Sequence, residues 1–152
     1  MIKEYGNMTL LVKKTHPDAL LPTRATSGSA GYDLYARIDS PITLPPGGRA
    51  VVPTGIAIGL PDAQTVGLVY ARSGLAVRHG LTLSNGVGVI DSDYTGEIQV
   101  GLVNLSDKAY TIQPGERIAQ LVITPVLLPQ LTETDQLTQT DRGAGGFGST
   151  GR

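Results

Sequence analysis

The sequence contains no cysteine and no tryptophan, and it has one phenylalanine and two histidines. Without cysteine the chain forms no disulfide and supplies no thiolate to a metal or a substrate. His16 and His79 are widely separated, so they do not suggest a histidine-based metal centre. The chemistry is therefore left to carboxylates, hydroxyls, amides, arginines and backbone groups.

The chain also lacks a strong net charge and a long apolar run. Its formal net charge is −1, so no overall field attracts nucleic acid. No stretch is long and apolar enough to span a membrane, and the first residues, MIKEYGNM, have no signal-peptide core. These absences predict a cytoplasmic protein with neither a nucleic-acid nor a membrane partner.

Glycine and proline are abundant, with 20 and 10 residues in a chain of 152. This length fits one domain, large enough to bury roughly 68–70% of its unfolded surface. The combined share of about a fifth stays below the roughly 25–30% that is typical of disorder. It favours a fold with many tight turns.

Short segments rich in Val, Ile, Thr and Tyr predict strands, because half-buried strands prefer these residues. Turn sequences such as Asn85-Gly86 and Pro114-Gly115 separate them. We predict an all-β sandwich, jelly roll or barrel with at most one short helix, which would start at Ser73 and end at Gly80. The expected strands are Thr9–Lys14, Arg49–Ile58, Thr65–Tyr70, Ile98–Leu105, Lys108–Ile112 and Arg117–Leu127.

The character of the chain changes after Pro129, where a polar stretch without strand-like continuity begins. We expect an N-terminal extension over residues 1–8, a β domain over 9–129 and a C-terminal arm over 130–152.

The arm ends in RGAGGFGSTGR, residues 142–152. Its glycines free the backbone, and successive N–H groups in such a turn bind anions. Arg142 adds positive charge, and Ser149 and Thr150 add hydroxyl donors. Phe147 could cover a flat ring of a ligand. The motif does not match a Walker-type phosphate loop, because it has no Gly-Lys-Ser/Thr and no predicted strand before it. A disordered tail is the alternative interpretation.

Two polar clusters in the first half of the chain suit charge chemistry. Asp33 lies between bulky residues, and a buried carboxylate must be paired or take part in chemistry; a turn or capping aspartate is the alternative. Arg72, Ser73 and Gly74 follow a strand, where an arginine, a hydroxyl and free N–H groups at a helix start suit a phosphate. A simple N-cap is the alternative there.

The densest polar cluster is residues 85–97, which suggests a hairpin with apolar approach strands and a polar tip. The Asn85 side chain offers a donor and an acceptor together, which suits an imide edge. Asp91 and Tyr94 would then face a sugar and water. A surface turn with two solvated carboxylates is the alternative interpretation.

The two strands that follow also carry polar side chains. In the run 97–104, Gln99 belongs to a small mixed face that fits packing around a subunit axis as well as it fits an ordinary core strand. After Pro114-Gly115, alternation predicts Arg117 and Ala119 on one face and Ile118 and Gln120 on the other. A glutamine on an apolar face needs a partner.

Five polar segments, in this order and spacing, resemble the five motifs of the trimeric dUTP diphosphatases (dUTPases). They are residues 30–36, 71–76, 85–97 and 114–121 and the terminal motif of the arm. The likeness runs from about Thr9 to Arg152, and GVIDSDYTGEI, PGERIAQLV and RGAGGFGSTG are its most specific parts. It implies a jelly-roll-like β-barrel that assembles as a homotrimer with active sites shared among three chains. It also implies that dUTP is hydrolysed to dUMP and pyrophosphate, and that the arm of one chain closes another chain's site.

The resemblance implies roles for individual residues. Asp91 would activate the water that attacks the α-phosphorus, and Mg²⁺ would bind the three phosphates, with Asp33 near the metal-bound waters or an arginine. Tyr94 would stack under the deoxyribose and exclude a 2′-hydroxyl. The other substrate-binding residues would be Arg72, Ser73, Gly74 and Gln120 at the phosphates, Asn85, Gly88, Val89 and Ile90 at the uracil edge, Arg142, Gly148, Ser149 and Thr150 at the γ-phosphate, Phe147 over the base, and Gln99.

Other functions fit parts of the same pattern. A dCTP deaminase-type enzyme would share the fold, although Asn85 and the full terminal motif speak against it. A dUTP-sensing regulatory protein and a purely structural β-trimer are the alternatives outside enzymology.

Overall fold

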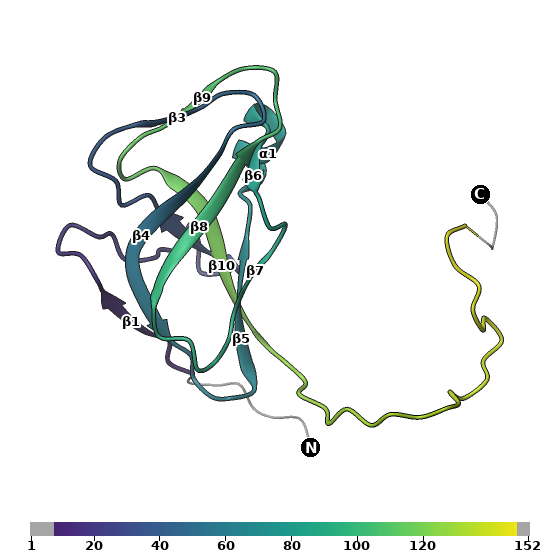
Figure 1. Cartoon of the computed structure of the whole chain (residues 1–152). Helices are drawn as coiled ribbons and strands as arrows, with labels where there is room; N and C mark the ends of the chain where they lie inside the picture. Colours follow the sequence, from purple (N-terminus) through teal and green to yellow (C-terminus); the bar gives the residue numbers. More distant parts are fainter. Residues whose placement is uncertain (1–7, 149–152) are drawn as a thin grey trace.

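The computed structural model describes residues 8–148, which form short strands and one helix (Figure 1). The elements are β1 (Leu11–Lys14), β2 (Tyr32–Tyr35), β3 (Ile42–Leu44), β4 (Arg49–Gly59), β5 (Thr65–Tyr70), α1 (Ser73–His79), β6 (Leu81–Leu83), β7 (Gly88–Ile90), β8 (Glu97–Asn104), β9 (Tyr110–Ile112) and β10 (Arg117–Pro125). Sheet A has the strand order β1-β4-β8-β6, sheet B has the order β2-β10-β5-β7, and β3 pairs with β9 in a third, two-stranded sheet.

One hydrophobic core joins sheets A and B. Val52 and Leu102 of sheet A and Leu34 and Leu121 of sheet B all belong to it, and none of them is more than 1% exposed. The predicted all-β class with one short helix is confirmed. The strands form open sheets that share a core rather than one closed barrel.

The long strands follow the sequence prediction more closely than the short ones. In β8 every second side chain is buried, while Gln99 between them is exposed. Helix α1 ends at Gly80, which adopts the left-handed conformation with φ 65°. Strands β3 and β6 were not predicted, because three residues are too few to show alternation.

The segment around Asn85 does not form the expected hairpin. Strand β6 pairs with β8 in sheet A, whereas β7 pairs with β5 in sheet B. The chain crosses between the sheets through a turn in which Gly86 has φ 74° and donates its N–H to the Leu83 carbonyl at 3.2 Å. The turn was predicted correctly. The pairing was not, because core packing selects the partner strands.

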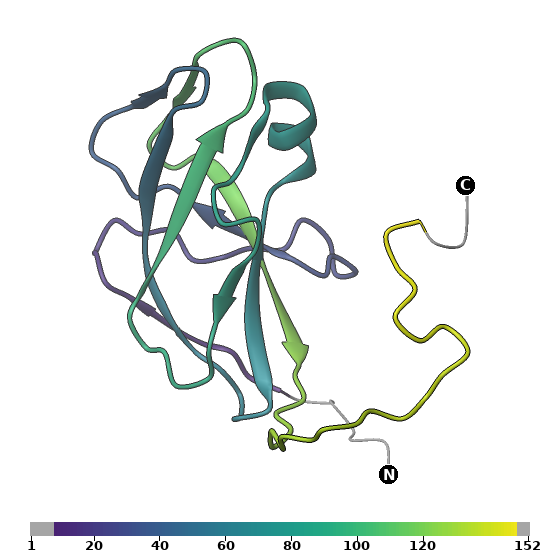
Figure 2. The same ribbon diagram turned by 45° about the vertical axis from the view of Figure 1, so that its right-hand side comes forward.

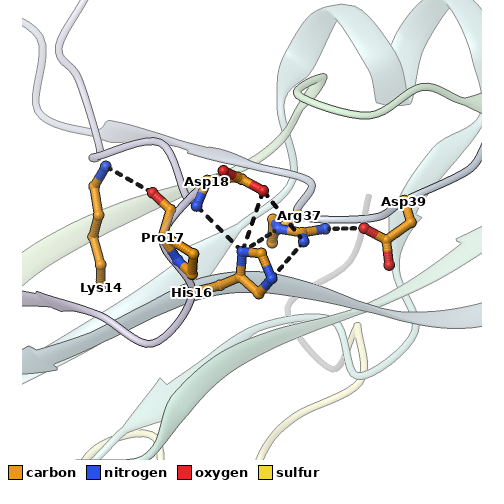
Figure 3. Close-up of polar contacts among 6 residues, drawn as sticks. All are labelled: Lys14, His16, Pro17, Asp18, Arg37 and Asp39. Carbon is orange, nitrogen blue, oxygen red and sulfur yellow. Dashed lines mark hydrogen bonds and ion pairs between the residues drawn. The ribbon is translucent and has the colours of Figure 1, made fainter.

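A charged cluster around Arg37 fastens the loop after β1 to the rest of the domain (Figure 3). Arg37 Nε donates to His16 Nδ1 at 2.7 Å, and Arg37 Nη1 donates to Asp39 at 2.8 Å. The hydrogen bond from Arg37 lowers the pKa of Asp39 below its ordinary value. The His16 N–H also donates to the Gly55 carbonyl at 3.4 Å, so the loop is held against β4.

The chain after β10 runs away from both sheets, as Figures 1 and 2 show from two directions. Residues 126–148 contain no strand or helix. Leu131 is 95% exposed and Leu137 is 86% exposed, so the single chain leaves these apolar side chains uncovered. Within residues 8–148, no helix has the length and apolar character needed to cross a membrane.

Asn104, at the end of β8, is a polar side chain with no exposed surface. Its Nδ2 donates to the carbonyls of Leu44 at 3.0 Å and Lys108 at 2.7 Å, and its Oδ1 accepts from the Ser106 N–H at 3.0 Å. One amide therefore joins β3, β8 and the loop before β9.

We expect Asn104→Ala to lower the free energy of unfolding by about 1–3 kcal/mol, because it leaves buried backbone groups unpaired. Urea unfolding followed by circular dichroism measures the change. Thr43→Ala is the control, since it removes only an exposed hydroxyl pair with Thr111, and a surface change of this kind stays within about 0.5 kcal/mol. Equal losses in the two variants would contradict the role given to Asn104.

Candidate active site

Two hollows contain most of the residues that the sequence singled out. The first hollow, of about 290 Å³, lies where the chain crosses from β6 to β7 and where β8 begins. Core side chains such as Val69 and Ile98 form its apolar floor. It brings together the predicted residues Asn85, Gly88, Val89, Ile90, Asp91, Tyr94 and Gln99.

Three polar side chains at the first hollow have no side-chain partner among residues 8–148. Within residues 8–148, Asn85, Asp91 and Gln99 make no side-chain hydrogen bond or ion pair, and all three are exposed. A pocket with an apolar floor and a few free polar groups is the usual form of a small-molecule site. The amide and the carboxylate are therefore available to a ligand.

The loop between β7 and β8 holds Asp91 and Tyr94 in one unit. The Tyr94 N–H donates to the Asp91 carbonyl at 3.1 Å, and the Tyr94 hydroxyl donates to the Glu97 carbonyl at 2.9 Å. The Glu97 carboxylate in turn accepts from the Gly55 N–H at 2.7 Å. The loop is thus tied to itself and to β4.

The second hollow, of about 320 Å³, lies beside β2, β10 and the segment that joins β5 to α1. Asp33 lines it, and its side chain is only 14% exposed. The two carboxylate oxygens accept from Arg72 Nε at 2.9 Å and from Arg117 Nη1 at 3.4 Å. The predicted pairing of Asp33 is confirmed, although the residue is half-buried. The alternative interpretation as a turn or capping aspartate is wrong, because Asp33 lies within β2.

Gln120 lies at the second hollow on the outer face of sheet B. A bulge between Arg117 and Ala119 places Ile118, Ala119 and Leu121 all in the core, so the expected alternation through this strand is wrong. Gln120 Nε2 donates to the carbonyl of Ala71 at 3.0 Å, which supplies the partner that the sequence required.

The start of α1 completes the second hollow. Arg72 is the N-cap residue and makes no side-chain capping bond, so the alternative of Ser73 as a simple N-cap is wrong. Ser73 and Gly74 both line the hollow. A Cβ atom on Gly74 would meet no other atom within 4 Å. Packing against the described residues does not require glycine at this position, and Gly74 has no positive φ. A ligand that approaches the backbone closely would require it.

Sheet B separates the two hollows. Gln120 lines the second hollow, while its neighbour Leu121 is buried opposite Val69, which lines the first. Successive side chains of a strand point to opposite faces, so the hollows lie on opposite faces of the sheet. The two groups of predicted site residues in one chain are therefore on different sides of sheet B.

The arm residues predicted to take part in the site line neither hollow. Arg142 Nε donates to the Gly145 carbonyl at 3.1 Å, which closes a tight turn. Phe147 is fully exposed, and it is the one non-glycine residue with positive φ in the described part of the chain. Gly148 follows it. Ser149 and Thr150 lie outside the described residues.

The carboxylate and imidazole side chains of the described residues determine whether the protein by itself would hold a metal ion. Among residues 8–148, no three His, Asp or Glu side chains are grouped so that they would hold one. Both oxygens of Asp33 face arginines. These residues fit a cation that arrives bound to an anionic ligand. A contact between Asp33 and metal-bound water stays a prediction.

Tyr110 and Glu116 form a side-chain contact that was not identified from the sequence. The Tyr110 hydroxyl donates to the Glu116 carboxylate, and its ring packs on His79 of α1 with centroids 5.1 Å apart. Burial, assisted by the hydrogen bond to Glu116, raises the pKa of Tyr110 to about 12. Tyr110 thus links α1 to the turn before β10, a contact that depends on distant pairing and leaves no local signal.

The structure defines an all-β protein with two hollows on opposite faces of one sheet. Residues 18–151 match the dUTPase family, and the chain belongs to that family of enzymes.

Relatives of known name support the assignment. The chain is 52% identical over 132 residues to the deoxyuridine 5′-triphosphate nucleotidohydrolase of Burkholderia cenocepacia, with 87% of this chain and 89% of that protein covered. A protein of the same name from Desulfitobacterium hafniense is 52% identical over 131 residues, covering 86% and 87%.

Solved structures agree with the family. The Staphylococcus bacteriophage 80alpha dUTPase with dUpNHpp superposes with a TM-score of 0.86 and 30% identity, covering 96% of this chain and all of that one. A variant of the phage phi11 dUTPase, described as coordinating a structural Mg(II) ion, has a TM-score of 0.76 and 26% identity, covering 86% and 99%.

Tyr110 makes stability depend on alkaline pH. Because the folded state raises the pKa of Tyr110 from 10.0 to about 12, its stabilising contribution is complete below about pH 10 and is lost as the pH rises through 12. We expect the difference in unfolding free energy between the wild-type chain and Tyr110→Phe to shrink over this interval, measured by urea unfolding. A constant difference would contradict the assignment.

Proposed function

We propose that the protein hydrolyses dUTP to dUMP and pyrophosphate. The observation that carries the proposal is the first hollow, where the free Asn85 amide and the free Asp91 carboxylate stand beside an apolar floor. Membership of the dUTPase family supports it, as do the nucleotidohydrolase names of the relatives.

Asn85 reads the uracil edge, because its amide offers a donor and an acceptor to an imide. Backbone groups of Gly88, Val89 and Ile90 complete this recognition. Cytosine presents a donor where uracil presents an acceptor. A buried N–H that faced this donor would be left unpaired, which supports a kcat/KM for dCTP that is roughly 10⁴–10⁵-fold lower than for dUTP. The methyl of thymine would overpack the hollow, at a cost of about 1–3 kcal/mol.

Arg72, Ser73, Gly74 and Gln120 bind the phosphates. Asp33 holds the Arg72 guanidinium at 2.9 Å, so the cation is oriented before the substrate arrives. A Mg²⁺ ion bound to the triphosphate would neutralise part of its charge, and among the described residues no group of His, Asp or Glu side chains would hold the ion by itself. Hydrolysis of such a substrate needs positioning and charge stabilisation more than covalent chemistry.

Asp91 is the general base. It accepts a proton from water as the water oxygen bonds to the α-phosphorus, and the bond from that phosphorus to the bridging oxygen breaks to release pyrophosphate. The chain contains no cysteine, and no lysine lines either hollow. Direct attack by water is therefore favoured over a covalent intermediate.

The active protein is a homotrimer. Because sheet B separates the two hollows, one substrate is bound between the first hollow of one chain and the second hollow of another. The arm (residues 130–152) closes the site of a neighbouring chain: Arg142 with Gly148, Ser149 and Thr150 contacts the γ-phosphate, and Phe147 covers the base. An exposed Phe147 and exposed arm leucines support this assembly.

A regulatory role is a second candidate, favoured by one comparison. The 80alpha phage dUTPase, 30% identical to this chain, is described as controlling the transfer of virulence genes. Such a role would use the same dUTP site to contact a protein partner, and it is compatible with hydrolysis.

We expect Asp91→Ala to lower kcat for dUTP by about 10²–10⁴-fold, the usual contribution of a general base, while the variant still binds dUTP. Pyrophosphate release measures the rate, and calorimetry with a non-hydrolysable analogue measures binding. Asp93→Ala is the matched control, since this carboxylate lies two residues away and does not line the hollow. Full activity of Asp91→Ala would assign the base to another group.

The same assay across dUTP, dCTP, dTTP and UTP tests the substrate. Release of pyrophosphate from dUTP alone is expected. Ammonia released from dCTP at a matching rate would identify a deaminase instead.

Truncation after Asp141 should leave the fold and the trimer intact, because residues 142–148 form no strand or helix and, among residues 8–148, Arg142, Gly143 and Gly145 hydrogen-bond only within the arm. Turnover of dUTP should fall by about 10²-fold or more, since the substrate is no longer held in position. Light scattering measures the assembly and pyrophosphate release the rate. Normal turnover by the truncated chain would refute closure by the arm.

A further inference from the structure

Gly96 lies directly beneath the ring of Tyr94. A Cβ atom on Gly96 would lie 2.6 Å from the Tyr94 hydroxyl oxygen and 2.7 Å from Cζ. Real Cβ atoms do not approach other atoms so closely, so any side chain at position 96 would displace the ring. The backbone itself does not require glycine, because Gly96 is not among the residues with positive φ.

The ring has a second attachment at the same place. Its hydroxyl donates to the Glu97 carbonyl at 2.9 Å, and Glu97 is fixed by the bond from the Gly55 N–H to its carboxylate. The Tyr94 ring is therefore held at the edge of the first hollow by two contacts. It packs against the Gly96 backbone and hydrogen-bonds to the Glu97 carbonyl.

Displacement of the ring would cost the fold little. Tyr94 is 47% exposed, so it can turn toward water without opening a cavity in the core. A methyl group at position 96 should therefore change the shape of the hollow and leave the domain folded. The buried glycine Gly67 differs, because a Cβ there would press on Leu121 and Ile90.

We propose that Gly96 is a specificity-determining position, which acts by letting Tyr94 lie flat where the sugar of the nucleotide binds. This inference rests on the proposed function, in which Tyr94 stacks under the deoxyribose and excludes a 2′-hydroxyl. Gly96 touches no substrate atom in this scheme. It positions the tyrosine, and its lack of a side chain sets the sugar selectivity.

The test compares kcat/KM for dUTP and UTP in the wild-type trimer and in Gly96→Ala. We expect Gly96→Ala to lower the ratio of dUTP to UTP by about 10–100-fold, the range expected when one small contact in a pocket changes. Thermal unfolding should show little change. Gly28→Ala is the matched control, because a Cβ at Gly28 meets nothing within 4 Å, and it should keep the wild-type ratio.

A double-mutant cycle separates this positioning from a general disturbance. Tyr94→Ala alone should lose the sugar selectivity, and adding Gly96→Ala to it should cause no further loss. Tyr94→Phe, which keeps the ring and removes only the bond to Glu97, should fall between wild type and Tyr94→Ala.

Each outcome has a distinct meaning. An unchanged ratio in Gly96→Ala, or an equal loss with and without Tyr94, would overturn the role of Gly96 while leaving dUTP hydrolysis intact. If Gly96→Ala does not fold, full selectivity in Tyr94→Ala would overturn the inference. A wild-type protein that hydrolyses neither nucleotide would refute the proposed function itself.

Discussion

The position of sheet B between the two hollows is the constraint on which the rest of the site depends. Leu121 and Val69 are neighbours on adjacent strands and both are buried on the core face of sheet B, so Gln120 lies on its outer face, whereas the first hollow lies on the core side. In the proposed function, the base-reading amide and the phosphate-binding groups lie on opposite faces of this sheet, which favours a site shared between chains. The proposed trimer is compatible with this geometry, and it would give the exposed arm a neighbouring site to close.

Within each hollow, hydrogen bonds among protein groups orient some residues and leave others free. Asp33 faces two arginines and Gln120 bonds to Ala71, so the second hollow is organised before any ligand arrives. Asn85 and Asp91 have no partner among the described residues. This division is the expected one for a catalyst, in which preorganised charges hold the substrate and unpartnered groups read it and act on it.

The glycines of the site fall into two kinds. At Gly31 and Gly96 another side chain occupies the place where a Cβ atom would be. It is Gln120 at Gly31 and Tyr94 at Gly96. Gly74 has open space where a side chain would be. Glycines of the first kind let a neighbouring side chain of the protein pack against the backbone. A glycine of the second kind leaves space in which a ligand could bind. Coordinates distinguish the two, whereas the letters of the sequence do not.

Features that depend on a few neighbouring residues could be predicted from the sequence. They include the alternation of β8, the turn at Asn85-Gly86 and the end of α1 at Gly80, which follow from side-chain or backbone preferences. The need of Asp33 and Gln120 for partners was equally clear, because burial of a polar group demands one. The partners themselves, the bulge in β10, the crossing of β6 and β7 into different sheets and the contact of Tyr110 with His79 arise only in the folded domain. They depend on which distant strands pack together, and core packing chooses those pairs through contacts that no local pattern encodes.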